Sequence, residues 1–226
     1  MSGRSKYMIL MAVLMILLLP FLLISCYVHP VADDFTYAYK GMTYGLLDNL
    51  AGEYLNWNGR YFSNMLVVLN PFHYAGLSGY QLVPVILILL LPVAFYLLLR
   101  VLFGNSIPKS GIFCASVLFT LLYINGMPQI AEGIYWYTGS VTYFTGNILF
   151  LLIVSLIVMQ LHHHFWPGKR AIHYAAVGVL LFALHGLNEI HMIVMLLLFV
   201  LVNVIIYVHQ KRFSGVMFLY LVFSLA

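Results

Sequence analysis

The chain has 226 residues, of which 64% are hydrophobic and 7% are charged, and its formal net charge is +4. Soluble domains carry about 25% charged residues, so this composition excludes a protein with a fully water-facing surface and indicates one whose solvent is lipid. The length allows about six or seven spans of roughly 20 residues each. Because the basic residues sit in separate loops, the positive charge favours orientation in a membrane over binding of nucleic acid.

Recurring apolar runs predict an all-α, polytopic transmembrane helical bundle that forms a single domain, residues 1–226, with about seven spans. The first run lacks a small-residue cleavage site and is too long for a signal peptide, so we expect a retained helix. The last run is still apolar where the sequence ends, and we therefore expect a C-terminally truncated fragment. The runs are Tyr7–Val28, Tyr80–Phe103, Gly111–Asn125, Val141–Leu161, Ala171–Leu187, Ile190–His209 and Gly215–Ala226.

The charged residues divide between the two sides of this predicted bundle. One side holds eight of the ten Lys and Arg residues, namely Arg4, Lys6, Arg100, Lys109, Lys169, Arg170, Lys211 and Arg212. The other side receives every carboxylate, namely Asp33, Asp34, Asp48, Glu53, Glu132 and Glu189. The positive-inside rule makes the basic side cytoplasmic. We therefore expect a cytoplasmic N-terminus and an extracytoplasmic acidic face.

The long extracytoplasmic loop, residues 29–79, is predicted to contain amphipathic juxtamembrane helices. Apolar residues recur with helical spacing over 46–55, and polar residues fill the gaps, which is typical of a helix lying along the membrane interface. A second short helix is expected over Tyr61–Leu69, ending before Pro71.

An acidic pair, Asp33-Asp34, follows the first span by a few residues, just after Pro30. Adjacent carboxylates repel each other, and such a pair suits a general base or a divalent cation site. The alternative is that one aspartate caps a helix over Phe35–Lys40, although a cap explains one carboxylate and not both.

The segment from Trp57 to Tyr61 contributes Arg60, one of two basic residues on the acidic side. A guanidinium there could bind a phosphate through two parallel hydrogen bonds. The alternative is an ion pair with Glu53 or with one of the aspartates. Both interpretations remain open from the sequence.

The second outer loop places Glu132 before three consecutive aromatics, Tyr135, Trp136 and Tyr137. We expect these rings to form a flat, exposed platform, which could stack on a sugar or belong to the aromatic belt of the membrane interface. Glu132 favours a binding role, because a carboxylate gains nothing from contact with lipid.

The short connection between the fifth and sixth runs holds His185, Asn188, Glu189 and His191. Ionisable groups at this depth are expensive, which makes them functional candidates. Helical spacing places His185 and Glu189 on one face, and the alternative use of such residues is helix–helix hydrogen bonding. Asp34, Glu189 and His191 are the candidates for a divalent cation, although no fixed ligand spacing supports a metal site.

The segments "ADDF", "WNGRYFSN", "EGIYWYTGSVTY" and "GLNE" resemble, in this order, the glycosyltransferase-C superfamily, and more narrowly a bacterial family of similar membrane proteins. The resemblance implies an inner-membrane enzyme that transfers a sugar from a polyprenyl-phosphate carrier to an extracytoplasmic acceptor.

The resemblance also implies roles for the residues of these segments. Asp33 or Asp34 would deprotonate the acceptor hydroxyl, and Arg60 would hold the carrier phosphate. The implied substrate-binding residues are Trp57, Glu132, Tyr135, Trp136, Tyr137, His185, Asn188 and Glu189. The competing interpretations are a transporter or flippase of a lipid-linked or polar solute, and a non-catalytic assembly subunit.

Overall fold

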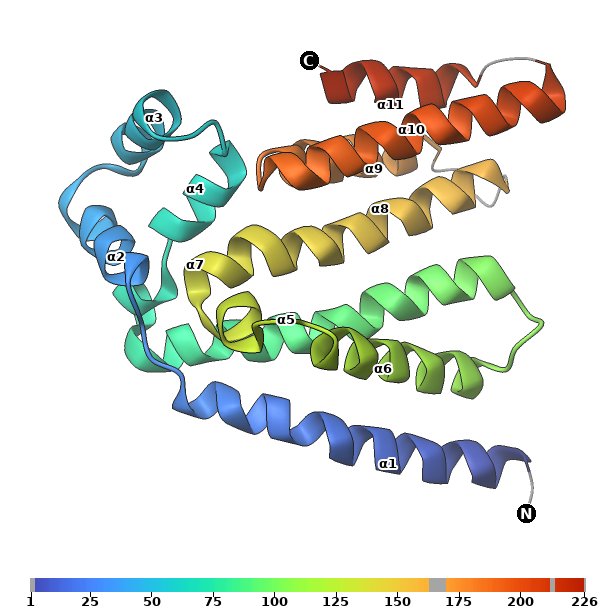
Figure 1. Cartoon of the computed structure of the whole chain (residues 1–226), viewed down its shortest axis with the longest axis horizontal. Helices are drawn as coiled ribbons and strands as arrows, with labels where there is room; N and C mark the ends of the chain where they lie inside the picture. The colour runs from blue at the N-terminus through green and yellow to red at the C-terminus, as the bar shows by residue number, and fades with distance from the viewer. Residues whose placement is uncertain (1–2, 163–169, 212–213, 226) are drawn as a thin grey trace.

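A computed structural model describes residues 3–162, 170–211 and 214–225, and within these residues every regular element is helical (Figure 1). The elements are α1 (Gly3–Ile24), η1 (Ser25–Tyr27), α2 (Asp33–Thr43), α3 (Leu46–Asn56), α4 (Tyr61–Val68), α5 (Pro71–Phe103), α6 (Lys109–Asn125), η2 (Ala131–Tyr135), α7 (Tyr137–Gly139), η3 (Ser140–Phe144), α8 (Thr145–Leu161), α9 (Arg170–His185), α10 (Glu189–Gln210) and α11 (Gly215–Leu225). The predicted all-helical fold class is confirmed.

Four helical segments of the described chain are long and apolar enough to cross a membrane, and not the seven that the sequence predicted. They are Ser5–Tyr27, Pro71–Phe103, Tyr137–Leu161 and Glu189–His209. Three further apolar helices are shorter, with 17 residues in α6, 16 in α9 and 11 in α11. At about 1.5 Å per residue even α6 measures about 26 Å, which is less than the roughly 30 Å of a hydrocarbon core.

The long helices lie side by side, with α5, α8 and α10 running in one direction and α1 in the opposite one, and the shorter α6 and α9 return the chain between them (Figure 1). One apolar cluster joins α1, α5, α6 and α8, and a second joins α8, α9, α10 and α11. Helix α8 belongs to both, with Ile148 in the first cluster and Ile153 in the second. Most of α1 and α10 faces outward, including Ile16 and Leu197, as expected for helices whose neighbours are lipid tails.

The two ends of the bundle differ in charge. The start of α1 and the C-terminal ends of α5, α8 and α10 lie at one end, here called the basic end, where Lys6, Arg100, Lys109, Arg170 and Lys211 are found (Figure 1). The predicted basic residues Lys169 and Arg212 lie outside the described residues. The other end, here called the polar end, carries α2, α3, α4, η2, α7 and the start of α10, and these elements hold the six carboxylates. This arrangement agrees with the predicted division of charge.

The two helices expected in the first outer loop are present as α3 and α4, and α2 precedes them. Helix α3 presents its polar side inward, where Asn49 and Glu53 are buried, while Leu47 is 79% exposed on the opposite side. Helix α5 begins at Pro71, earlier than the predicted start at Tyr80. A kink at Gly76, with φ of 59°, separates this early part from the span and uses a backbone conformation that glycine favours.

Candidate functional site

Two cavities lie at the polar end and share Asp33, Tyr37 and Trp57. The large cavity, of about 560 Å³, runs between α2 and α3 and is lined by Asp33, Thr36, Tyr37, Lys40, Tyr44, Asp48, Asn49, Gly52, Glu53, Asn56 and Trp57. The small cavity, of about 180 Å³, is lined by Asp33, Tyr37, Trp57, Asn58, Arg60, Ser63, Asn64, Val67, Trp136, Thr138, Gly139, Thr142 and Tyr143. The shared residues place Asp33 where the two cavities meet.

Asp34 is fully buried and acts as an anchor for the polar end. Its Oδ2 accepts hydrogen bonds from the Tyr80 hydroxyl at 2.6 Å and from the Val31 N–H at 3.1 Å. Its Oδ1 accepts from the Thr138 N–H at 3.1 Å and from the Thr138 hydroxyl at 2.7 Å. Four donors from three parts of the chain satisfy a charge that burial would otherwise make very costly. We call Asp34 with Val31, Tyr80 and Thr138 the Asp34 anchor.

The backbone before Asp34 is strained. Ala32 has φ of 48° and ψ of −117°, a conformation that residues with a Cβ rarely adopt. A turn fixes it, because the Asp34 N–H donates to the Val31 carbonyl while the Asp34 carboxylate accepts from the Val31 N–H. Buried Asn70 supports the same turn, since its Nδ2 donates to the Asp34 carbonyl and its Oδ1 caps α5 at the Phe72 N–H. The strain is held in place by contacts from α5.

Asp33 differs from Asp34 in its exposure and in its access to the cavities. It is exposed and lines both cavities. Its neighbour uses both carboxylate oxygens internally, so Asp33 is the carboxylate of the predicted acidic pair that a ligand can reach. Both aspartates also begin α2, where negative charge interacts favourably with the helix dipole.

The large cavity contains a second group of charges. Lys40 forms an ion pair and hydrogen bond with buried Glu53, and its Nζ lies 5.5 Å from the centre of the Tyr37 ring. Burial, together with the nearby carboxylates of Glu53 and Asp33, raises the pKa of Tyr37 to about 12, so this phenol stays neutral at physiological pH. The ammonium of Lys40 contacts Glu53 and Tyr37. The carboxylates of Asp33 and Asp48 remain exposed.

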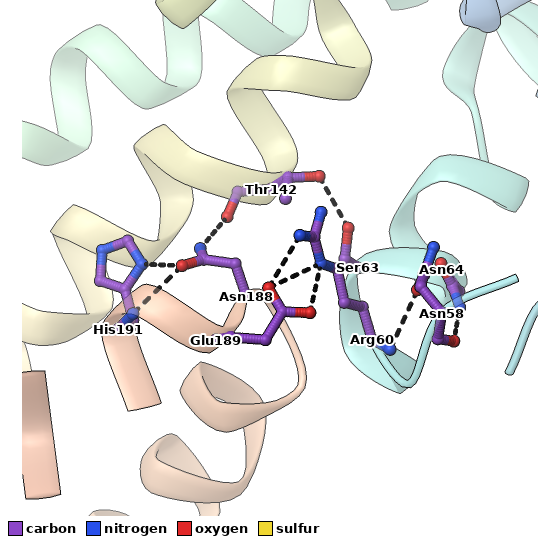
Figure 2. A network of polar contacts seen from close by, with 8 residues as sticks. All are labelled: Asn58, Arg60, Ser63, Asn64, Thr142, Asn188, Glu189 and His191. Atoms are coloured by element: carbon purple, nitrogen blue, oxygen red, sulfur yellow. Dashed lines mark hydrogen bonds and ion pairs between the residues drawn. The ribbon is translucent and has the colours of Figure 1, made fainter. Parts of the chain in front are cut away.

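Arg60, which lines the small cavity, forms a bidentate ion pair with Glu189 at the start of α10 (Figure 2). The Arg60 Nε donates to Oε1 at 2.9 Å and to Oε2 at 3.2 Å, and Nη2 donates to Oε2 at 2.7 Å. Hydrogen bonding to Glu189 is the main cause that raises the pKa of Arg60. The alternative of an ion pair is thus found with a different partner from those considered, since Arg60 pairs with Glu189, whereas Glu53 faces Lys40 and Asp34 faces α5 and α7.

Asn188 positions the start of α10 beside the small cavity (Figure 2). Its Oδ1 caps α10 by accepting from the His191 N–H at 3.1 Å and lies 2.9 Å from His191 Nδ1, while its Nδ2 donates to the Thr142 carbonyl at 2.9 Å. The Thr142 and Ser63 hydroxyls are 2.7 Å apart. The carbonyl of Gly186 accepts from the N–H groups of Phe62 and Ser63 at the start of α4, each at 2.9 Å. These contacts fix α4, η3 and the start of α10 relative to one another.

The predicted His185–Glu189 face does not exist, because α9 ends at His185 and α10 begins at Glu189. His185 packs near Phe223, with ring centroids 6.4 Å apart, and lines neither cavity. Asn188, also predicted to bind substrate, is 1% exposed and holds the helix start instead of facing either cavity. The chain reverses through residues 186–188, which separates two side chains that an unbroken helix would place together.

The predicted aromatic platform is also wrong for two of its three rings. Tyr135 and Tyr137 are buried and donate their hydroxyls to the backbone carbonyls of Phe21 and Leu66, at 2.8 and 2.6 Å. Trp136 alone of the three lines the small cavity. The π-helical turn η2 and the short helix α7 direct successive rings differently, and the sequence pattern carries no sign of this.

The metal candidates are not brought together. Asp34 is enclosed by four donors, Glu189 binds Arg60, and His191 contacts Asn188. Among the described residues, no group of three His, Cys, Asp or Glu side chains is arranged to hold a metal ion. Glu132, the remaining carboxylate candidate, is exposed and lines neither cavity. The donor set therefore does not fit the divalent cation considered from the sequence.

The sequence interpretation missed the polar side of α2. Asp33, Tyr37 and Lys40 are spaced as neighbours on one helical face, and this spacing could have indicated a shared cavity wall. Tyr80 and Thr138 were missed because nothing near them in sequence indicates that they bind Asp34.

The cavities, their charges and the Asp34 anchor are thus the observations on which an assignment of function depends. Comparisons of the chain with protein-family models, with curated proteins and with solved structures give no match.

Proposed function

We propose that the chain is a membrane glycosyltransferase that transfers a sugar from a polyprenyl-phosphate carrier to an acceptor at the polar end. The observation that carries the proposal is an open carboxylate, Asp33, where a large cavity meets a small one that contains Arg60. A transferase needs two substrates to meet beside a base, and two cavities joined at one carboxylate provide that arrangement. The resemblance of the sequence to the glycosyltransferase-C superfamily supports the same reaction.

In the proposed reaction Asp33 is the base. Its carboxylate takes the proton of the acceptor hydroxyl as that oxygen forms a bond to the anomeric carbon of the sugar. The bond between the anomeric carbon and the carrier phosphate oxygen breaks, and its electron pair leaves with the phosphate. Arg60 stabilises the negative charge of the leaving phosphate. Glu189 holds the Arg60 guanidinium through Nε and Nη2, and the Tyr143 side chain also hydrogen-bonds to it, so the phosphate shares the guanidinium with these two groups.

We further propose that the polar end faces the extracytoplasmic side of a bacterial inner membrane. The support is the gathering of basic residues at the other end, which the positive-inside rule assigns to the cytoplasm. In this orientation α6, α9 and α11 also lie within the bilayer, because they pack between or beside the four longer helices.

Orientation can be tested with single cysteines in a variant lacking Cys26 and Cys114. Gly59 and Ser106 are both exposed, at the polar and basic ends respectively, and have room for a thiol. A membrane-impermeant thiol reagent added to intact cells should label Gly59→Cys, whereas Ser106→Cys should be labelled only after permeabilisation. The reverse pattern would contradict the proposed orientation.

The function is tested with the chain in nanodiscs, using a polyprenyl-phosphate-linked sugar for both binding and transfer. Arg60→Ala should weaken carrier binding by about 10-fold to 100-fold, the usual worth of hydrogen bonds to a charged group. Arg100→Ala, which removes a guanidinium at the basic end, is the matched control and should leave binding unchanged. Asp33→Asn should retain binding and lower the transfer rate by about 10²-fold to 10⁴-fold.

Two results would contradict this assignment. Carrier binding that no variant affects, or no binding at all, would remove the proposed role of Arg60. Movement of the carrier across sealed vesicles without sugar transfer would favour the transporter interpretation instead.

A further inference from the structure

We propose that the large cavity binds the acceptor, and that this acceptor is a carbohydrate bearing amino groups. This inference rests on the proposed function and adds the substrate class of the cavity between α2 and α3. The argument uses the size of the cavity, the chemistry of its walls and its charge.

The size and walls of the cavity suit a short oligosaccharide. Its volume of about 560 Å³ lies within the usual range for small-molecule sites. Trp57 and Tyr44 line it while remaining 76% and 58% exposed, so two large aromatic side chains lack a protein partner to cover them. The flat apolar face of a pyranose stacks on such rings, and Asn56 and Thr36 offer groups that pair with hydroxyls.

The charge of the cavity selects among oligosaccharides. Asp33, Asp48 and Glu53 contribute three carboxylates, and Lys40 contributes the one ammonium among its lining residues, which leaves two negative charges. Lys40 contacts Glu53, so it does not offset the exposed Asp33 and Asp48. A cavity of this sign attracts cations and repels anions. A carbohydrate with ammonium groups therefore fits better than a neutral one, and an acidic one fits worst.

The small cavity provides the contrast within the same site. Its charged lining residues are Asp33 and Arg60, one of each sign, and Arg60 suits the phosphate of the donor. The two cavities thus differ in the charge that they accept. Because Asp33 belongs to both, a hydroxyl of an acceptor in the large cavity lies beside the proposed base.

The test measures binding of three tetrasaccharides to the full chain in nanodiscs by calorimetry at pH 6. The probes are the tetramer of glucosamine, which is cationic, that of N-acetylglucosamine, which is neutral, and that of galacturonic acid, which is anionic. We expect affinity to fall in this order. Asp48→Asn should weaken binding of the cationic probe by about twofold to fivefold and leave the neutral probe unchanged.

A matched pair of aromatic variants tests the stacking contact. Trp57→Ala should weaken binding of both the cationic and neutral probes by about threefold to tenfold. Tyr54→Ala removes another exposed aromatic ring of α3 that does not line the cavity, and it should change neither affinity.

The inference is overturned if the galacturonic acid tetramer binds as tightly as the glucosamine tetramer, or if Trp57→Ala and Tyr54→Ala behave alike. Because no donor is present, these results do not depend on sugar transfer. Charge-ordered binding in a protein that transfers no sugar would reject the proposed reaction and keep the cavity assignment. Transfer without charge-ordered binding would do the opposite.

Discussion

The Asp34 anchor and the cavity wall at Asp33 depend on adjacent residues, but the two aspartates differ in burial and in hydrogen bonding. Asp34 is buried and receives four hydrogen bonds, whereas Asp33 is exposed and opens into both cavities. The two residues of one acidic pair thus differ in role, because Asp34 holds α2 in place and Asp33 faces the two cavities. Adjacent side chains at a helix start point in different directions, so identical neighbours can have different roles.

The largest expected effect on stability separates the two aspartates directly. Asp34→Asn places an NH₂ group against the donors of Tyr80 or Thr138 and removes a buried charge, which should lower the free energy of unfolding by about 3–5 kcal/mol. Asp33→Asn should change it by less than about 0.5 kcal/mol, since Asp33 is exposed. Reversible unfolding in mixed detergent micelles measures both. Equal losses in the two variants would show that the anchor does not distinguish them.

Tyr80→Phe should have the next largest effect. The variant removes the hydroxyl that donates to Asp34, and it also leaves the Tyr137 N–H, which donates to that hydroxyl at 3.2 Å, without an acceptor. We expect a loss of about 3 kcal/mol in the same unfolding measurement. Tyr135→Phe is the control, because its hydroxyl donates to a neutral carbonyl and should cost about 1 kcal/mol. A smaller loss for Tyr80→Phe than for Tyr135→Phe would contradict the importance of the anchor.

Thr138→Val tests one bond of the anchor while keeping another. The valine loses the hydroxyl bond to Asp34 Oδ1 but retains the backbone N–H that donates to the same oxygen. The expected loss is about 2 kcal/mol. Thr43→Val removes an exposed hydroxyl that bonds to the Tyr39 carbonyl and should cost less than about 0.5 kcal/mol. Thermal unfolding followed by circular dichroism should rank the two in this order.

The smallest expected effect is a gain in stability, opposite in sign to the losses predicted above. Ala32→Gly relieves the positive φ of 48° before Asp33 and should raise the free energy of unfolding by about 1 kcal/mol. The same substitution within α2, Ala38→Gly, should lower it by at least about 1 kcal/mol, because the residue is buried in a helix. If both variants lose stability, Ala32 is not strained.

The sequence predicted the features that depend on local pattern. Apolar runs located the long helices, and the spacing over 46–55 located α3, because both signals come from residues close together in the chain. Helical spacing gave a wrong prediction where a helix is interrupted, as between His185 and Glu189. Asn188 is a frequent helix-capping residue and could have marked the break before Glu189, but the Gly186 carbonyl that caps α4 is a contact across the fold.

The candidate site was predicted in part. Asp33, Trp57, Arg60 and Trp136 were named and do line the cavities. Tyr135 and Tyr137 were named for the same purpose and are buried, because an aromatic ring beside a membrane serves packing as well as it serves binding. Whether an aspartate is open or enclosed depends on Tyr80 and Thr138, far away in sequence. No local pattern carries that information.

The ion pair between Arg60 and Glu189 joins residues 129 positions apart, and this separation has a consequence for biosynthesis. At typical rates of translation of about 5–20 residues per second, roughly 6–26 s pass between the synthesis of Arg60 and that of Glu189. During this interval the Arg60 guanidinium lacks the Glu189 carboxylate. The nascent chain therefore passes through a stage in which α2–α4 have emerged but are not yet joined to α10, and the ion pair forms only when the helix starting at Glu189 has been inserted.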